Sequence, residues 1–168
     1  VMAGPEKKSR IISDEEKENT AYHEVGHALL AKLLKDCDPL HKVSIIPRGM
    51  ALGITLTLPE KDHLTMRKNQ LLDRIAMILG GRVAEELIYG KDNITTGASN
   101  DLEKVSSLAR SMVTTYGMSE KMGNLAYGKD QEHIFLGRNF GNTRDFSEEI
   151  AADIDKEVKK IVDKQYDH

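Results

Sequence analysis

The chain has 168 residues, a length that suits one domain with its own hydrophobic core. Charged residues make up 30% of it and apolar residues 39%, as in ordinary globular proteins, and the formal net charge of −3 gives no basic footprint for nucleic acid. The single cysteine, Cys37, excludes a disulfide framework within the chain and favours a reducing compartment. No apolar run reaches the roughly 20 residues of a membrane span, and we expect no signal peptide.

The first predicted helix covers residues 14–35. Ser13, followed by Glu16, has the pattern of a capping box at its start. The apolar periodicity of this helix predicts two neighbouring stripes, one of Tyr22, Gly26, Leu29 and Leu33 and the other of His23, His27, Leu30 and Leu34.

This helix contains the sequence His23-Glu24-Val25-Gly26-His27, which has the pattern H-E-x-x-H. Residues four positions apart share one face of a helix, so both imidazoles can reach one metal ion. The glutamate beside the first histidine can act on a water at that metal. Because chance rarely produces the full pattern, we interpret it as a zinc hydrolase site that cuts amide bonds with zinc-activated water, rather than as two core histidines.

Two β-prone runs follow, at residues 43–46 and 53–58, with a turn between them. They predict a small antiparallel ribbon. We expect Gly53, Ile54 and Thr55 to bind an extended peptide, because an exposed strand can pair with any peptide backbone. A purely structural ribbon is the alternative.

Three further helices are predicted. The first of them is capped by Thr65 and ends at Tyr89, and it contains Gly80-Gly81. This glycine pair indicates either a break in the helix or the close approach of another helix or of the metal site. The next helix opens near Asn100 with a capping-box pattern and extends to Tyr116. Residues 118–144 are predicted to be mostly loop or extended, and a last helix covers residues 147–166.

A catalytic zinc site usually has a third protein ligand. Leu30 and Leu33 stand where a metzincin motif would continue with glycine and histidine, so that arrangement is excluded. Glu85 and Glu86 match only in part a glutamate on a later helix. Asp101 is another candidate, in the first turn of a helix. On spacing alone, an equally good explanation of Asp101 is a carboxylate that stabilises the helix dipole.

Six segments of the chain carry a specific resemblance to one family. They are residues 4–10 (GPEKKSR), 20–28 (TAYHEVGHA), 41–49 (HKVSIIPRG), 80–87 (GGRVAEEL), 96–102 (TGASNDL) and 112–119 (MVTTYGMS). In these segments the chain resembles the peptidase domain of FtsH-type, membrane-anchored AAA zinc proteases, over nearly its whole length. One departure is Val25, where the family commonly has alanine; this position faces away from the metal, so we expect only a change in packing.

The resemblance implies that His23, His27 and Asp101 bind one Zn²⁺ per chain and that Glu24 is the general base. It implies that Glu85 lies beside the site as the partner of a ligating histidine, which would fix the histidine tautomer. The implied fold is mainly α-helical with a small antiparallel β-ribbon, and the implied assembly is a homo-hexamer.

The resemblance also implies a longer parent protein. Residues 1–12 would be the linker from an N-terminal ATPase module, preceded by transmembrane segments, and residues 13–168 the zinc peptidase domain. No G-x-x-x-x-G-K-[ST] motif occurs in the chain, so we expect it to bind no ATP. The expected substrates are unfolded or membrane proteins. The expected location is the bacterial inner membrane, with this domain in the cytoplasm, or an organelle membrane. A zinc-binding scaffold without activity and a hydrolase of small amides are the remaining alternatives.

Overall fold

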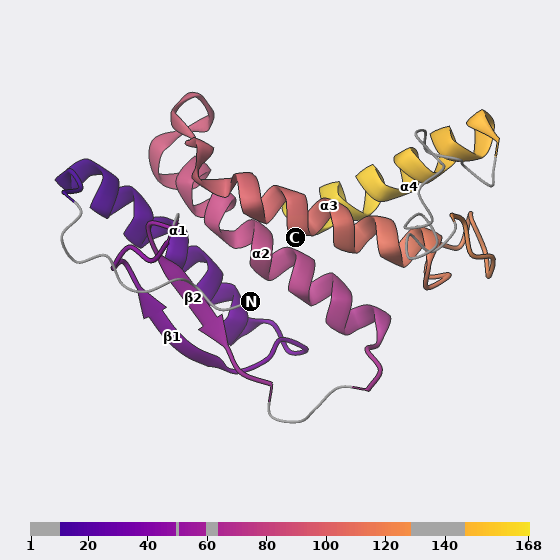
Figure 1. Ribbon diagram of the computed structural model, residues 1–168, viewed down its shortest axis with the longest axis horizontal. Helices are drawn as coiled ribbons and strands as arrows, with labels where there is room; N and C mark the ends of the chain where they lie inside the picture. Colours follow the sequence, from indigo (N-terminus) through magenta and orange to yellow (C-terminus); the bar gives the residue numbers. More distant parts are fainter. Residues whose placement is uncertain (1–10, 50, 60–63, 129–146) are drawn as a thin grey trace, which may run out of the picture.

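Four helices and a two-stranded sheet make up the computed structural model, which describes residues 11–49, 51–59, 64–128 and 147–168. Helix α2 lies in the centre, with α1 and the strands on one side and α3 and α4 on the other (Figure 1). The predicted fold, mainly α-helical with an antiparallel ribbon, is confirmed. The elements in chain order are α1 (Asp14–Leu33), β1 (Leu40–Ser44), β2 (Ile54–Thr57), α2 (Lys68–Tyr89), the short 3₁₀ turns η1 (Lys91–Asn93) and η2 (Thr96–Ala98), α3 (Ser99–Thr114) and α4 (Glu148–Asp167).

Two of the helices begin at a serine cap. The Ser13 hydroxyl accepts a hydrogen bond from the backbone N–H of Glu16 at 3.2 Å, as predicted, and three acidic residues in the first turn of α1 complement its dipole. Ser147 caps α4 in the same way, with Ile150 as the donor. The predicted starts of these two helices are therefore confirmed. Helix α1 ends two residues earlier than the sequence pattern predicted.

The caps predicted for the other two helices are wrong. Helix α2 begins after Arg67 rather than after Thr65, and its first turn is closed by the Gln70 side chain, which accepts from the Arg67 N–H at 2.7 Å. Helix α3 begins at Ser99, and its N-cap residue makes no side-chain capping bond. The turn η2 leads directly into α3, so the capping box predicted at Asn100 does not form.

Helices α1 and α2 cross with their backbones in contact. An added Cβ on Gly26 would lie 2.8 Å from the Cβ of Ala84 and would overlap the carbonyl of Gly80. A Cβ on Gly80 would lie 2.7 Å from the carbonyl oxygen of Gly26. Helix α2 runs through Gly80 and Gly81 without interruption. Of the two interpretations of this glycine pair, close approach is therefore confirmed and the helix break is wrong.

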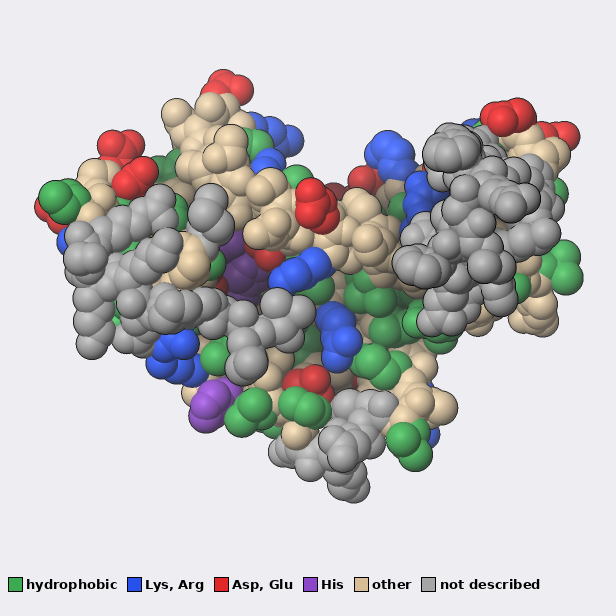
Figure 2. Space-filling model, viewed as in Figure 1, with side chains coloured by type: hydrophobic (Ala, Val, Ile, Leu, Met, Phe, Trp, Pro, Cys, Tyr) green, Lys and Arg blue, Asp and Glu red, His purple; other side chains and the backbone are tan. Residues whose placement is uncertain are grey.

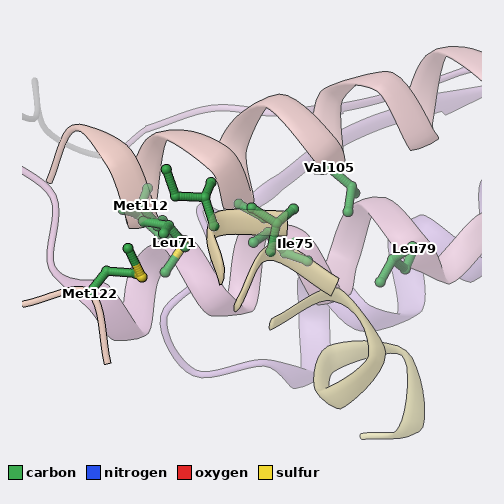
Figure 3. Packing of buried hydrophobic residues seen from close by; sticks show 10 residues of the cluster. Leu71, Ile75, Leu79, Val105, Met112 and Met122 are labelled. Carbon is green, nitrogen blue, oxygen red and sulfur yellow. The ribbon is translucent and has the colours of Figure 1, made fainter. Parts of the chain in front are cut away.

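The hydrophobic core lies on the side of α2 that faces away from α1. Figure 3 shows Leu71, Ile75 and Leu79 along one face of α2, with Val105 and Met112 of α3 against them. Ile154 and Val158 of α4 complete this cluster. Full burial of a side chain such as Ile75 contributes about 1.5–3 kcal/mol, so this cluster fixes α3 relative to α2.

The buried face of α1 is unusually polar. It consists of Thr20, His23, Glu24, His27, Ala28 and Ala31. The stripe predicted from Tyr22, Leu29 and Leu33 is instead exposed, with Leu33 70% accessible to solvent. The helix thus turns its histidines inward, and most of its large apolar side chains do not belong to the core.

The ribbon pairs β1 with β2 in antiparallel register, Val43 opposite Thr55 and Ser44 opposite Ile54. Strand β1 starts earlier than predicted. It also ends earlier, at Ser44, whose hydroxyl accepts from the N–H of Ile46 and turns the chain. After α3 the chain turns at Gly117, whose φ of +61° is readily adopted by glycine. Residues 118–128 form no helix or strand, as predicted, and residues 1–10 and 129–146 lie outside the described part of the chain.

None of the described helices has the length and apolar character that crossing a membrane requires.

Replacing Gly26 by Ala tests the helix crossing. Alanine in an isolated helix is about 1 kcal/mol better than glycine. At this position the added methyl meets backbone that cannot move aside, so we expect the free energy of unfolding to fall by about 1–3 kcal/mol. Chemical denaturation measures the change. Val25→Ala at the neighbouring exposed position is the control and should be nearly neutral. A Gly26→Ala protein as stable as the parent would contradict the close contact.

Candidate metal centre

Three side chains from two helices converge at one point. His23 and His27, one turn apart on α1, place their Nε2 atoms 3.0 Å from each other. The Oδ2 atom of Asp101, in the first turn of α3, lies 3.0 Å from His23 Nε2 and 3.2 Å from His27 Nε2. Both histidines are buried. The structure therefore brings together the three residues that the family resemblance implied as metal ligands.

The tautomer of His27 follows from its second ring nitrogen. His27 Nδ1 lies 2.9 Å from the backbone carbonyl oxygen of Met77 on α2. A carbonyl can only accept a hydrogen bond, so Nδ1 carries the proton and donates. In the neutral ring Nε2 then bears a lone pair, which points toward His23 and Asp101. This is the orientation that a metal-binding histidine needs.

His23 is oriented by a buried carboxylate. Its Nδ1 atom lies 3.6 Å from Oε2 of Glu85, a residue with no solvent exposure. Neither of these two atoms makes a hydrogen bond among the described residues, and their separation is that of an ion pair rather than of a hydrogen bond. When Nδ1 carries the proton, that proton faces the carboxylate and Nε2 is left with its lone pair. The structure thus places Glu85 where the resemblance implied it.

The other oxygen of Glu85 ties together three segments. Oε1 accepts from the Asn19 side-chain amide at 2.7 Å and from the Thr95 hydroxyl at 2.6 Å. Asn19 lies on α1, one turn before His23, and the Thr95 hydroxyl also caps η2, the turn that leads into α3. One buried carboxylate thereby fixes α1, α2 and the chain segment that delivers Asp101.

Gly81 makes room for the His23 ring. A Cβ at this position would lie 2.5–2.7 Å from three atoms of the imidazole. The His23 ring therefore packs flat on the α2 backbone, and any larger residue at position 81 would push it out of place. The sequence pattern allowed close approach at the metal site as one meaning of this glycine pair, and the contact between Gly81 and His23 has that form.

The site opens into a cleft of about 710 Å³. Figure 2 shows imidazole and carboxylate surface together at the bottom of a recess on this face of the molecule. Residues 51–55, which include the predicted peptide-binding residues Gly53, Ile54 and Thr55, line this cleft, as does the segment that precedes α3. Glu24 lies at this cleft, buried on the same face of α1 as the histidines.

The charges at the centre favour a cation. Burial opposes ionisation of Asp101, but hydrogen bonds from His23 and His27, which form only while their Nε2 atoms carry protons and no metal is bound, outweigh it and hold the pKa of Asp101 far below its usual range. Burial lowers the pKa of His27, yet its contacts with Asp101 outweigh this and leave that pKa raised. A carboxylate that is ionised at all ordinary pH values thus faces two imidazoles.

The geometry of the three atoms fits a zinc ion. Bonds of about 2.0–2.1 Å in a tetrahedron separate ligand atoms by roughly 3.3 Å, and the three separations here are within a few tenths of an ångström of that value. Three atoms that each bear a lone pair repel one another unless protons or a cation lie between them. Two histidines and one carboxylate, beside an open cleft, form the donor set of a catalytic rather than a structural zinc site.

Comparison with known proteins identifies the family. Residues 10–168 match the model for peptidase family M41. This chain belongs to peptidase family M41. The predicted resemblance to FtsH-type zinc proteases and the prediction of a peptidase are thereby confirmed.

Similar proteins carry consistent names. The chain is 52% identical to the ATP-dependent zinc metalloprotease FtsH 1 of Thermoanaerobacter sp., over 99% of this chain and 27% of that protein. It is 55% identical to the ATP-dependent zinc metalloprotease FtsH of Myxococcus xanthus, over 96% and 25% of the two chains. For the protein of the same name from Acidobacterium capsulatum the values are 54%, 99% and 26%. Their names agree with zinc as the predicted cofactor. The chain spans about a quarter of the length of these relatives.

Sequence reasoning missed three residues that hydrogen-bond to the side chains of the site, namely Asn19 and Thr95, which bind Glu85, and Met77, which binds His27. Asn19 had a usable signal, because it lies four residues before His23 and therefore on the same helix face. The contributions of Met77 and Thr95 depend on which segments lie opposite, which periodicity does not report.

Replacing Asp101 by Asn tests its assignment as a ligand against its alternative role in the helix dipole. We expect zinc affinity to fall at least about 100-fold, because a charged ligand becomes a neutral amide. Competition with a chromophoric chelator measures the dissociation constant. Asp92→Asn, at an exposed position outside the centre, should bind zinc like the parent. The alternative role predicts a different result. If Asp101→Asn binds zinc like the parent and loses only about 1 kcal/mol of stability or less, which is the helix-dipole contribution, then Asp101 is not a ligand.

The same titration predicts a pH dependence. Zinc must displace the proton that His27 retains up to its raised pKa. Zinc affinity should therefore fall as the pH is lowered through that pKa, and binding should release protons there. Calorimetry in buffers of different ionisation enthalpy counts the released protons. Zinc binding without proton release at that pH would contradict the protonated state of His27 in the metal-free protein.

Proposed function

We propose that this chain is the zinc endopeptidase domain of an ATP-dependent, membrane-anchored protease, and that it hydrolyses peptide bonds in extended, unfolded polypeptides. The observation that carries this proposal is the convergence of His23, His27 and Asp101 beside Glu24 at the bottom of an open cleft. In this assignment the three converging residues hold one zinc ion per chain.

The residues of the chain have distinct tasks in the reaction. His23 and His27 are held by Glu85 and Met77 in the tautomers that leave both Nε2 atoms free for the metal. Zinc bound there supplies Lewis acidity and makes water nucleophilic near neutral pH. Glu24 takes the proton of the attacking water and then returns it to the nitrogen of the leaving amine.

The substrate docks as an extended strand. Within the described residues the sheet has two strands, so β2 pairs with β1 along one edge only, and residues 51–55 line the cleft. A peptide that pairs with this edge through its backbone lies across the metal centre whatever its side chains are. Gly53, Ile54 and Thr55 are the residues proposed to contact it, and this mode predicts broad tolerance of sequence.

The proposal for the larger assembly rests on the names and the lengths of the relatives. Their names include ATP dependence, and this chain covers only about a quarter of their length. We assign residues 1–12 as a linker from an ATPase module and residues 13–168 as the peptidase domain. The full-length protein is proposed to be a homo-hexamer in the bacterial inner membrane, with this domain on the cytoplasmic side. Its substrates are unfolded or membrane proteins.

Replacing Glu24 by Gln should separate metal binding from catalysis. We expect cleavage of unfolded casein by the zinc-loaded chain to fall at least about 100-fold, because the amide cannot accept the proton. Zinc stoichiometry and thermal stability should stay as in the parent. Glu103→Gln, an exposed position on α3, is the control and should cleave normally. Cleavage retained by Glu24→Gln would remove Glu24 from the role of base, and cleavage that survives a chelator would remove zinc from the reaction.

A set of N-methylated peptides tests the docking mode. In strand pairing, alternate residues of the peptide point their backbone N–H groups toward the partner strand. Methylation of those nitrogens should raise KM, and methylation of the intervening ones should have little effect. KM values for a fluorogenic peptide methylated at one position at a time give the pattern. If no methylated position raises KM, the ribbon is structural and the substrate binds in another way.

A further inference from the structure

Strand β2 touches the proposed general base directly. The Thr55 hydroxyl oxygen lies 2.6 Å from Oε2 of Glu24 and 3.0 Å from the backbone carbonyl oxygen of the same residue. Glu24 is buried and Thr55 is half-buried, so water has limited access to this contact. The side chain of Thr55 is thus directed at α1, although the sequence analysis assigned this residue to the substrate.

Gly53 allows the strand to come this close. A Cβ at Gly53 would lie 2.6 Å from Cγ2 of Thr20 and 2.9 Å from Cγ of Glu24. It would also lie 2.9 Å from the carbonyl oxygen of Ser44, on the paired strand. Helix α1 and the start of β2 therefore meet without an intervening side chain, at the level of the base.

The direction of the hydrogen bond is fixed by chemistry. An ionised carboxylate and a carbonyl can only accept, and the hydroxyl of Thr55 has one proton. The contact with Oε2 is 0.4 Å shorter than the contact with the carbonyl oxygen, so the hydroxyl donates to Oε2. A hydrogen bond to a charged oxygen is short and strong, as the 2.6 Å separation indicates. It occupies one oxygen of Glu24 and stops the carboxylate from rotating. The other oxygen, Oε1, is left to accept the proton of the attacking water.

We propose that Thr55 is a positioning residue that holds the carboxylate of Glu24 for proton transfer, and that one strand thereby places both the base and the substrate. This inference rests on the proposed function, because it assigns Glu24 as the base. Protonation of Oε1 leaves Oε2 able to accept, so the hydrogen bond persists in both states of Glu24. The backbone of residues 51–55 docks the peptide, while the Thr55 side chain keeps the base aimed at the bond to be cut.

A purely structural role would have different consequences. If the hydroxyl only fastened the ribbon to α1, its loss would lower stability and disturb peptide docking, and KM would rise. If it positions the base, its loss lowers kcat while KM, zinc binding and stability stay nearly constant. Thr55→Val removes the hydroxyl and keeps the shape, and Thr55→Ser keeps the hydroxyl and removes the methyl.

The kinetic experiment compares these variants as zinc-loaded chains with a fluorogenic peptide. For Thr55→Val we expect kcat to fall about tenfold or more and KM to change less than about twofold. Thr55→Ser should restore kcat to within about twofold of the parent. Thr57→Val is the matched control, because Thr57 lies on the same strand but lines a small separate cavity away from the metal centre. An unchanged kcat in Thr55→Val, or an equal loss in Thr55→Ser, would overturn the proposal.

NMR of the Glu24 carboxylate tests the same proposal without substrate turnover. With glutamate labelled by ¹³C at Cδ, the resonance of Glu24 is identified by its absence in Glu24→Gln. It should move in Thr55→Val and stay in place in Thr55→Ser and Thr57→Val. An unmoved resonance in Thr55→Val would overturn the proposal even if the zinc-loaded parent cleaved no peptide. A parent that cleaves nothing would instead count against the proposed function, so the two failures are distinguishable.

Discussion

The backbone contact between α1 and α2 at Gly26 and Gly80 is the constraint on which the metal centre depends. Because no side chain separates the two helices there, α2 can reach both histidines of α1. Gly81 receives the flat face of His23, Glu85 faces its Nδ1 atom, and the carbonyl of Met77 accepts from His27. These three positions on α2 are four residues apart, so they form one stripe along the helix. Helix α2 thus orients both imidazoles in the metal-free protein.

The same helix also determines where the third ligand lies. The face of α2 opposite to α1 carries the core that packs α3 and α4, so the position of α3 is fixed by apolar contacts well away from the polar site. The hydrogen bonds of Glu85 to Asn19 and Thr95 then secure the start of α3. Leaving a carboxylate fully buried is costly, and only Oε1 of Glu85 is hydrogen-bonded among the described residues, while Oε2 has only the contact with His23 Nδ1. Its retention here is explained by a role that an apolar residue cannot fill, namely to orient His23 and to join three segments at once.

The sequence was informative for several local signals, although the caps predicted at Thr65 and Asn100 did not form. The spacing of His23 and His27 and the cap at Ser13 depend only on helix periodicity and on the first turn of a helix, and the structure has them as predicted. The last helix also begins where its pattern predicted, and the structure adds the cap at Ser147. Predictions that depended on a distant segment were undecided or wrong. The glycine pair in α2 had two meanings until α1 was found opposite it. Asp101 could not be distinguished from a helix-dipole carboxylate by spacing, and the structure adds what spacing did not report, namely that its Oδ2 atom lies beside both Nε2 atoms. Periodicity also marked Leu33 as apolar without reporting that nothing in the described chain covers it.

In the docking mode proposed above, pairing with the peptide backbone explains why so much of this site is arranged in advance. Residues 51–55 can form only a few hydrogen bonds with a peptide, each worth about 0.5–1.5 kcal/mol net. Such weak binding suits an enzyme that accepts many sequences and releases its products. It leaves little free energy for organising the catalytic groups when the substrate binds, so those groups must be held by the fold itself. Glu85 and Met77 hold the imidazoles, and on the assignment proposed above Thr55 holds the base. Contacts within the fold thus hold the catalytic groups in place, so a tightly bound substrate is not needed to order them.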